Sequence, residues 1–226
     1  METSALRAQT HFQAGWNLAL GFPQGEFREN VKNTGIGFGL DFTYALPKIP
    51  VNFGGTFSVV TYGSESYDAY LDLPFDVFSG NPIKITTDNR ILQWDFLVRL
   101  QPQKRCIRPY IDGLIGFNYL STQTSFRDKY SLREFFNRTN FNDMVFSYGG
   151  GAGIMIKIYG VPGSRGLNAS DKTKLLLDLK VRYLWGESAD YLKKGTIGSI
   201  GDFMVFDVYQ SSTDLLTGQI GLAFEF

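Results

Sequence analysis

The sequence predicts an all-β fold, an eight-stranded antiparallel up-and-down transmembrane β-barrel. Three observations lead to this prediction. Eight runs alternate apolar residues with small or polar ones, the charges within those runs share one face, and the connections between them alternate between long and short. Phenylalanine, tyrosine and glycine are also abundant, at 20, 12 and 25 of 226 residues, which favours strands and tight bends over helices.

The first four runs place an apolar or small residue at every second position, which is the period of a strand with two different faces. Their apolar faces comprise Phe12, Ala14, Trp16, Leu18 and Leu20, then Ile36, Phe38, Leu40, Phe42 and Tyr44, then Val51, Phe53, Gly55, Phe57 and Val59, and then Leu92, Trp94, Phe96, Val98 and Leu100. The intervening positions are mostly small, polar or charged, so each run predicts one strand.

The last four runs repeat the pattern. Their apolar faces comprise Ile111, Gly113, Ile115, Phe117 and Tyr119, then Phe146, Tyr148, Gly150, Ala152, Ile154 and Ile156, then Leu175, Leu177, Leu179, Val181, Tyr183 and Trp185, and then Leu216, Ile220, Leu222, Phe224 and Phe226. Glycines cluster at 149–151 and 153, and at 35, 37 and 39. No Gly-Lys-Ser/Thr follows them, so they indicate close packing in a barrel rather than a phosphate cradle.

The charged residues within the eight runs all fall on the face opposite the apolar one. They are Asp41, Asp95, Arg99, Asp112, Lys157, Asp178, Lys180, Arg182 and Glu225. A soluble barrel of the lipocalin kind, the alternative fold, would carry its charges outside. In a membrane the reverse holds, because a charge facing lipid costs about 2–4 kcal/mol at mid-membrane. We expect a paired network that fills a narrow lumen, in preference to a gated ion path or a catalytic carboxylate pair.

The connections give a second line of support. They are long at 22–34, 63–90, 121–143 and 186–212, and short at 46–50 and 101–108. The third short connection, 159–172, is longer than usual and is the weakest part of the pattern. Membrane barrels turn tightly in the periplasm and loop widely outside, so both termini are expected in the periplasm. The barrel domain is expected to span 11–226, with no peptidoglycan-binding domain after it. Residues 1–10 resemble the end of a signal peptide and are expected to be a residual signal or a disordered N-terminus.

The C-terminal octapeptide, Gln-Ile-Gly-Leu-Ala-Phe-Glu-Phe at 219–226, is the most specific motif. With Pro-Gln-Gly-Glu-Phe at 23–27 and Arg-Pro-Tyr-Ile-Asp-Gly at 108–113, it resembles the small OmpA/OmpX-like outer-membrane barrels of the uncharacterised porin-family type. The resemblance implies a Gram-negative outer membrane, lipopolysaccharide as a neighbour, and a signal for the barrel assembly machinery at Ile220, Leu222, Phe224 and Phe226. It implies no established activity.

Aromatic and arginine side chains gather in the predicted long loops. We assign a contact surface to Tyr67, Tyr70, Phe75, Phe135, Phe136, Arg133, Arg138, Phe203 and Phe206. Aromatic residues with arginine are typical of binding hot spots, which indicates an extracellular protein, a glycan or a lipid A headgroup as the partner. The other interpretation is that these segments extend the strands and pack on one another.

Composition argues against several function classes. Lys+Arg and Asp+Glu both total 22, so no basic surplus indicates a nucleic-acid partner. One histidine, His11, one cysteine, Cys106, and no Gly-x-Ser-x-Gly motif give no catalytic set, so no enzyme and no cofactor are expected. The spacing of Asp68, Asp72, Asp76 and Asp88 matches no calcium loop, and no metal site is predicted.

The first functional hypothesis is a structural or partner-binding, adhesive outer-membrane barrel with a plugged polar lumen and long extracellular loops. The alternative is a small pore or transporter for small solutes or lipophilic molecules. An enzyme ranks third. The first predicts no conductance, and the second predicts a steady conductance or a lateral opening in the wall.

Overall fold

The computed structural model describes residues 11–31, 33–70, 82–102, 105–128, 134–160, 173–200 and 203–226. The predicted N-terminal segment 1–10 lies outside these residues, as do Phe75, Arg133, Asp72 and Asp76. Among the described residues, no helix is long and apolar enough to span a membrane.

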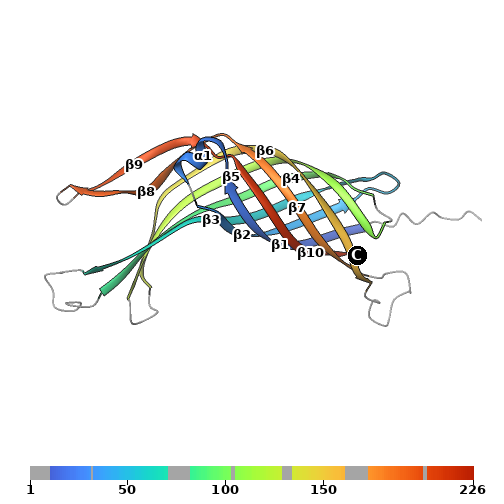
Figure 1. Cartoon of the computed structure of the whole chain (residues 1–226), viewed down its shortest axis with the longest axis horizontal. Helices are drawn as coiled ribbons and strands as arrows, with labels where there is room; N and C mark the ends of the chain where they lie inside the picture. Colours follow the sequence, from blue (N-terminus) through green and yellow to red (C-terminus); the bar gives the residue numbers. More distant parts are fainter. Residues whose placement is uncertain are drawn as a thin grey trace, which may run out of the picture.

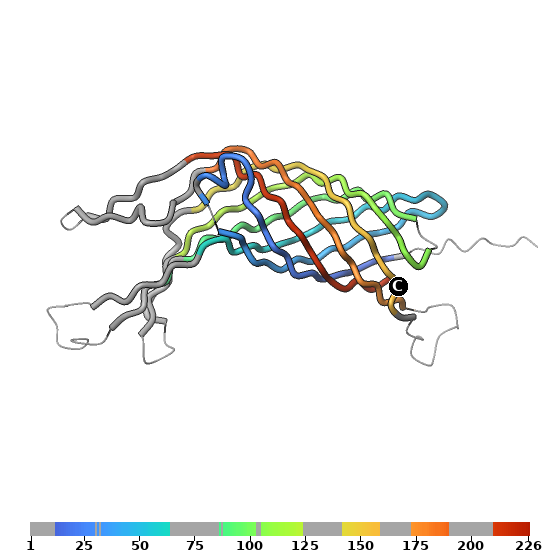
Figure 2. The backbone as a smooth tube through the Cα atoms, in the orientation of Figure 1, coloured from blue at the N-terminus to red at the C-terminus, as the bar shows by residue number. Residues whose placement is uncertain are grey.

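Eight antiparallel strands close into a barrel, which confirms the predicted strand number and pairing. They are β1 (His11–Pro23), β2 (Gly35–Ala45), β3 (Val51–Tyr70), β4 (Pro82–Leu100), β5 (Ile107–Asp128), β6 (Glu134–Gly160), β7 (Lys174–Gly186) and β10 (Leu215–Glu225). Their order around the barrel is β1-β10-β7-β6-β5-β4-β3-β2, so each pairs with its neighbours in sequence and β10 closes on β1 (Figure 1). The strands run obliquely to the long axis (Figure 2), as closure of a sheet requires.

The seam between the first and last strands is regular. Trp16 lies opposite Leu222 and Leu18 opposite Ile220, with Gln13 facing Glu225 near the ends of the chain. This register puts the beginning of β1 and the end of β10 at the same end of the barrel, which we call the termini end (Figure 1). The other is called the far end.

The short connection 46–50 is a tight turn at the termini end. The backbone N–H of Leu46 donates to the carbonyl oxygen of Val51 at 2.9 Å, which closes the turn. Lys48 adopts a φ of 71°, the left-handed conformation that single turn residues adopt. The proline at position 50 removes a backbone donor just before β3 begins, so the turn ends where strand pairing starts.

The long connections differ from the predicted loops. The connection 22–34 contains a short helix, α1 (Gly25–Asn30), and 186–212 folds as a hairpin of β8 (Ser188–Ile200) and β9 (Phe203–Ser212). Most of 63–90 and 121–143 is strand, because β3 to β6 continue past the length of β2 and β7. These segments therefore agree with the interpretation in which they extend the strands rather than with open loops. They lack the apolar alternation that a lipid-facing wall imposes, so the two-residue period gave no signal there.

The two faces of the eight runs lie as the alternation predicts. The apolar residues face outward, and Phe96 and Trp94 on β4 are 77% and 65% exposed. The alternate positions face inward and are mostly buried, among them Asn17 of β1 and Asp41 of β2. Outward aromatic rings stack across strands, as between Trp16 and Phe38, whose ring centroids are 6.4 Å apart. The outer wall is therefore apolar and aromatic around the whole barrel.

Candidate functional site: the lumen and its far end

The centre of the lumen holds a closed ring of charged and polar side chains from β2, β4, β5 and β7. Arg99 donates to both carboxylate oxygens of Asp112, at 2.7 and 2.9 Å. Asp112 also accepts from Arg182 at 3.0 Å. Arg182 then bonds Asp41 at 3.1 Å, so two arginines and two carboxylates from four strands form a chain of ion pairs across the barrel.

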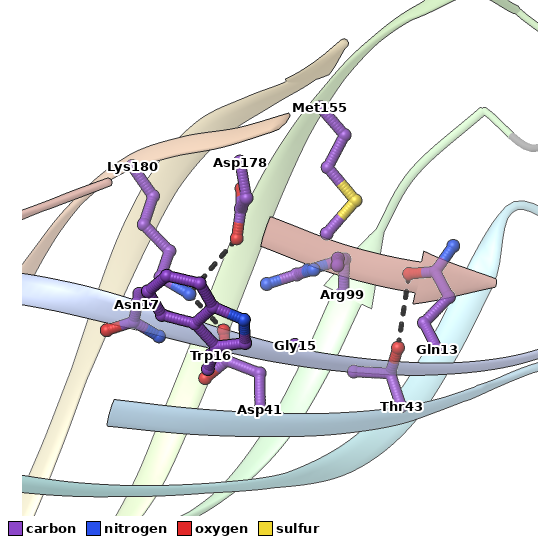
Figure 3. Close-up of a pocket in the computed structure, with 11 residues that line it drawn as sticks. Gln13, Gly15, Trp16, Asn17, Asp41, Thr43, Arg99, Met155, Asp178 and Lys180 are labelled. Atoms are coloured by element: carbon purple, nitrogen blue, oxygen red, sulfur yellow. Dashed lines mark hydrogen bonds and ion pairs between the residues drawn. The ribbon is translucent and has the colours of Figure 1, made fainter. Parts of the chain in front are cut away.

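The other half of the ring runs back through β7. Lys180 donates to Asp41 and, at 3.1 Å, to Asp178 (Figure 3). Asp178 accepts from the Tyr110 hydroxyl at 2.5 Å. The Arg99 guanidinium lies 3.8 Å from the centroid of the Tyr110 ring, a cation–π contact that closes the circle. We call Arg99, Tyr110, Asp112, Asp178, Lys180, Arg182 and Asp41 the charge ring.

A second cluster, the Glu225 cluster, lies at the termini end. Glu225 accepts hydrogen bonds from Arg108 and Lys174, and from the amide of Gln13 at 3.1 Å. Arg108 and Lys174 stand at the beginnings of β5 and β7, Arg108 at the end of the predicted connection 101–108 and Lys174 just before the predicted run at 175–185. Sequence reasoning missed both, although each has the inward parity of its strand. Glu225 thereby ties β10 to β1, β5 and β7.

The predicted lumen network is otherwise placed as expected, with one exception. Lys157 is exposed near the C-terminal end of β6, where a bulge follows, and it makes no ion pair with the described residues. Its assignment to the network is therefore wrong. Asp95 is buried on β4 and accepts a long hydrogen bond of 3.4 Å from Ser147. The nearby Ser58, Gln93 and Asn118 form a neutral polar chain.

An apolar cluster covers the far end of the lumen. Phe27 of α1 has no exposed surface and packs among inward side chains of the strands and the hairpin. The cluster, which we call the lumen cap, consists of Phe27, Tyr62, Ile91, Leu120, Val145 and Ala189. The rings of Phe27 and Tyr62 meet edge to face with centroids 5.3 Å apart. The helix therefore inserts one aromatic side chain into the barrel mouth, which nothing in the two-residue period could predict.

Little space remains between these layers. A cavity beside the charge ring, lined by Asn17, Asp41 and Lys180 among others, has a volume of about 10 Å³ (Figure 3). That is room for about one water molecule. An inner apolar layer of Leu97, Leu114 and Leu184 crosses the lumen as well. Side chains of the charge ring, the inner apolar layer and the lumen cap thus occupy the described lumen.

The other predicted positions are placed as follows. Ile220, Phe224 and Phe226 are exposed on the outer face of β10, and Leu222 on the same face is partly buried, so the predicted assembly signal forms one outward row. The predicted contact residues in the described chain lie in strands: Tyr67 and Tyr70 in β3, Phe135, Phe136 and Arg138 in β6, and Phe203 and Phe206 in β9. The structure does not gather them into one described surface, and their role stays a prediction.

The other candidate catalytic and metal-ligating residues do not come together among the described residues. Cys106 is a free, exposed thiol in the short connection before β5. His11 begins β1 opposite Ala45. Among the described residues no three His, Cys, Asp or Glu side chains come close enough to hold a metal ion. Asp68 and Asp88, the two described members of the predicted acidic set, lie in β3 and β4.

No protein-family model matches the sequence, and no curated protein matches it. Several solved structures are similar, among them these three. Neisserial surface protein A shares 11% identity over 96% of this chain and 95% of that chain, with a TM-score of 0.36. Ail, the attachment invasion locus protein of Yersinia pestis, shares 13% over 96% and 97%, with a TM-score of 0.39. A major outer membrane protein from Thermus thermophilus shares 14% over 95% and 99%, with a TM-score of 0.42. At these values the likenesses carry nothing about function to this chain, whose own strand pairing makes it a closed eight-stranded antiparallel barrel.

Proposed function

We propose that this chain is an integral barrel of the bacterial outer membrane with a sealed lumen, which acts as a structural or partner-binding protein. The observation that carries the proposal is the inverted distribution of charge. In the eight alternating runs the outward face holds no charged residue, whereas Asp, Glu, Arg and Lys side chains are buried inside. A barrel in water would expose that apolar wall at a cost of about 25 cal/mol per Å².

A membrane is the surrounding that suits both faces. Exposed apolar patches on monomers in water rarely exceed a few hundred Å², and this one encircles the barrel. In lipid every backbone group must be bonded internally, which a closed barrel achieves. Outer-membrane lipid and lipopolysaccharide are therefore the proposed neighbours, and the barrel assembly machinery is the proposed partner during insertion.

The first test of this proposal is gel mobility in SDS of detergent-extracted protein, boiled against unboiled. We expect the unboiled protein to run as a compact band that shifts on boiling, because a closed barrel resists SDS until heated. A protein that dissolves without detergent and shows no shift would overturn the proposal and favour a soluble ligand-binding barrel.

The sidedness is proposed from the lengths of the connections, with both termini in the periplasm. An epitope tag inserted between Pro47 and Lys48 would mark the termini end, and one inserted between Ile200 and Phe203 would mark the far end. On intact cells we expect antibody to label the second tag and to reach the first after the outer membrane is permeabilised. The reverse labelling would show that the barrel is inserted the other way.

The sealed lumen separates the proposed function from a pore. The charge ring, the inner apolar layer and the lumen cap block the path at successive levels, and the cavity beside the ring measures about 10 Å³. We expect no steady conductance in planar bilayers, measured on protein that has passed the gel-shift test. A reproducible open level from that protein would favour a pore or transporter instead.

A further inference from the structure

A groove lies on the outside of the barrel rim, where α1 meets the far ends of β1 and β10. Its volume is about 380 Å³, within the range of roughly 300–1,000 Å³ that small-ligand sites occupy. Its described lining includes Phe22, Val31 and Leu216, which are apolar, and Arg28 and Asn33, which are polar. One side of the groove is therefore apolar and the other carries a cation.

The apolar side continues the outer wall of the barrel. Phe22 of β1 and Leu216 of β10 are cross-strand neighbours. Each ends the outward row of its strand, after Leu18 and Leu20 on β1 and after Ile220 on β10. The apolar surface of the barrel wall is therefore continuous with the apolar side of the groove.

The polar side is set by the way α1 is held. Phe27 is buried in the lumen cap, which leaves the next side chain, Arg28, exposed on the outside of the helix. The backbone N–H of Gln24 donates to the Asp214 carbonyl at 3.0 Å and fixes the start of the helix against the connection between β9 and β10. Arg28 makes no ion pair with any described residue, and no carboxylate is among the described residues that line the groove.

We propose that this groove binds a phosphate-bearing membrane lipid, with the phosphate on Arg28 and an acyl chain along Phe22 and Leu216. The inference rests on the proposed membrane location. Guanidinium pairs with phosphate through two parallel hydrogen bonds, which makes arginine the preferred residue for this recognition. A cation beside an apolar wall, at the level where the wall ends, matches a lipid whose charge sits at the edge of the bilayer.

The test uses full-length protein in neutral detergent, with bisphosphorylated lipid A as the probe and native mass spectrometry to measure retention. The variant is Arg28→Gln, and the matched control is Arg105→Gln, an exposed arginine in the short connection between β4 and β5 at the termini end. We expect about tenfold weaker retention by Arg28→Gln, the size of one lost charge-assisted contact, and no change in the control. Wild-type protein should lose a similar factor with phosphatase-treated lipid A.

Three results would overturn the inference. The first is equal retention by wild type and Arg28→Gln, and the second is equal retention of phosphorylated and dephosphorylated lipid A. The third is displacement of lipid A by inorganic phosphate, which would indicate an anion site that ignores the acyl chain. All three are read on protein that keeps its gel shift, so failure of the lipid site stays distinguishable from failure of the membrane proposal.

Discussion

Arg182 joins its own strand to three others in the lumen. It bonds carboxylates of β2 and β5 and also the Thr56 hydroxyl of β3 at 3.1 Å. Room for it comes from β6, because a Cβ at Gly151 would lie 2.7 Å from the Arg182 Cγ. A Cβ at Gly153 would likewise overlap the Tyr110 ring. The glycine cluster of β6 thus lets the charge ring fit inside a barrel of eight strands.

We predict that Arg182→Met destabilises the barrel by about 3–5 kcal/mol, since it leaves Asp41 and Asp112 buried with incomplete pairing. Urea unfolding in detergent micelles, followed by tryptophan fluorescence, would measure the free energy. Arg105→Met, at an exposed position, serves as the control and should change stability by less than about 0.5 kcal/mol. Equal stability of Arg182→Met and wild type would show that the ring contributes nothing to stability.

Single residues differ in how far the sequence could place them. Parity put Asp41, Asp112 and Arg182 inside the barrel, because every second residue of a strand shares a face. It could not say which charges pair, since pairing across the lumen depends on strand tilt and stagger. Arg108 was missed because it was placed in the short connection 101–108 before the alternating run, whereas β5 already begins at Ile107.

The sequence did not predict the helix α1, because this helix is very short. It has six residues, too few for a helical period of 3.6 to stand out, and its side-chain cap is absent at Gln24. Tertiary contacts of Phe27 hold it in place instead. The hairpin β8–β9 escaped prediction for a related reason, because 186–212 shows no sustained two-residue alternation, whereas the extension of β3–β6 is one of the two interpretations that the sequence left open. The eight wall segments were predictable because each presents an apolar face at every second residue.

We predict that replacing 24–33 with a short Gly-Ser turn leaves a closed barrel that still conducts no ions. The lumen cap loses Phe27 but keeps its five other members, and the charge ring and the inner apolar layer are left unchanged. Gel shift would report closure, and planar-bilayer recording would report conductance. A steady open level in this variant would mean that the cap alone seals the barrel.

At the scale of the whole molecule, the surrounding medium decides which face is apolar. Phe96 lies midway along the outward row of β4, and Phe12 lies at the termini end of β1. Their side chains are 77% and 58% exposed, so neither substitution leaves a packing defect in the interior. Because both side chains are exposed, a difference between substitutions at Phe96 and Phe12 reports the depth of each position in the proposed bilayer.

We predict that Phe96→Arg costs about 2–4 kcal/mol and Phe12→Arg about 0–1 kcal/mol, following the depth dependence of a charge in a bilayer. Reversible unfolding from lipid vesicles would measure both, with Phe96→Leu as the control for loss of the ring. Equal costs at the two sites would contradict a bilayer around the middle of the barrel.

The seam between β1 and β10 can form only after the last strand has been synthesised. The hydrogen bond from Gln13 to Glu225 joins residues 212 positions apart, so the first strand has no second neighbour until the last has been made. A polypeptide stopped before Leu215 keeps two unpaired edges and an apolar face without cover. Synthesis and folding are therefore separate stages for this chain. Full resistance to proteases is therefore expected only once β1 has paired with β10.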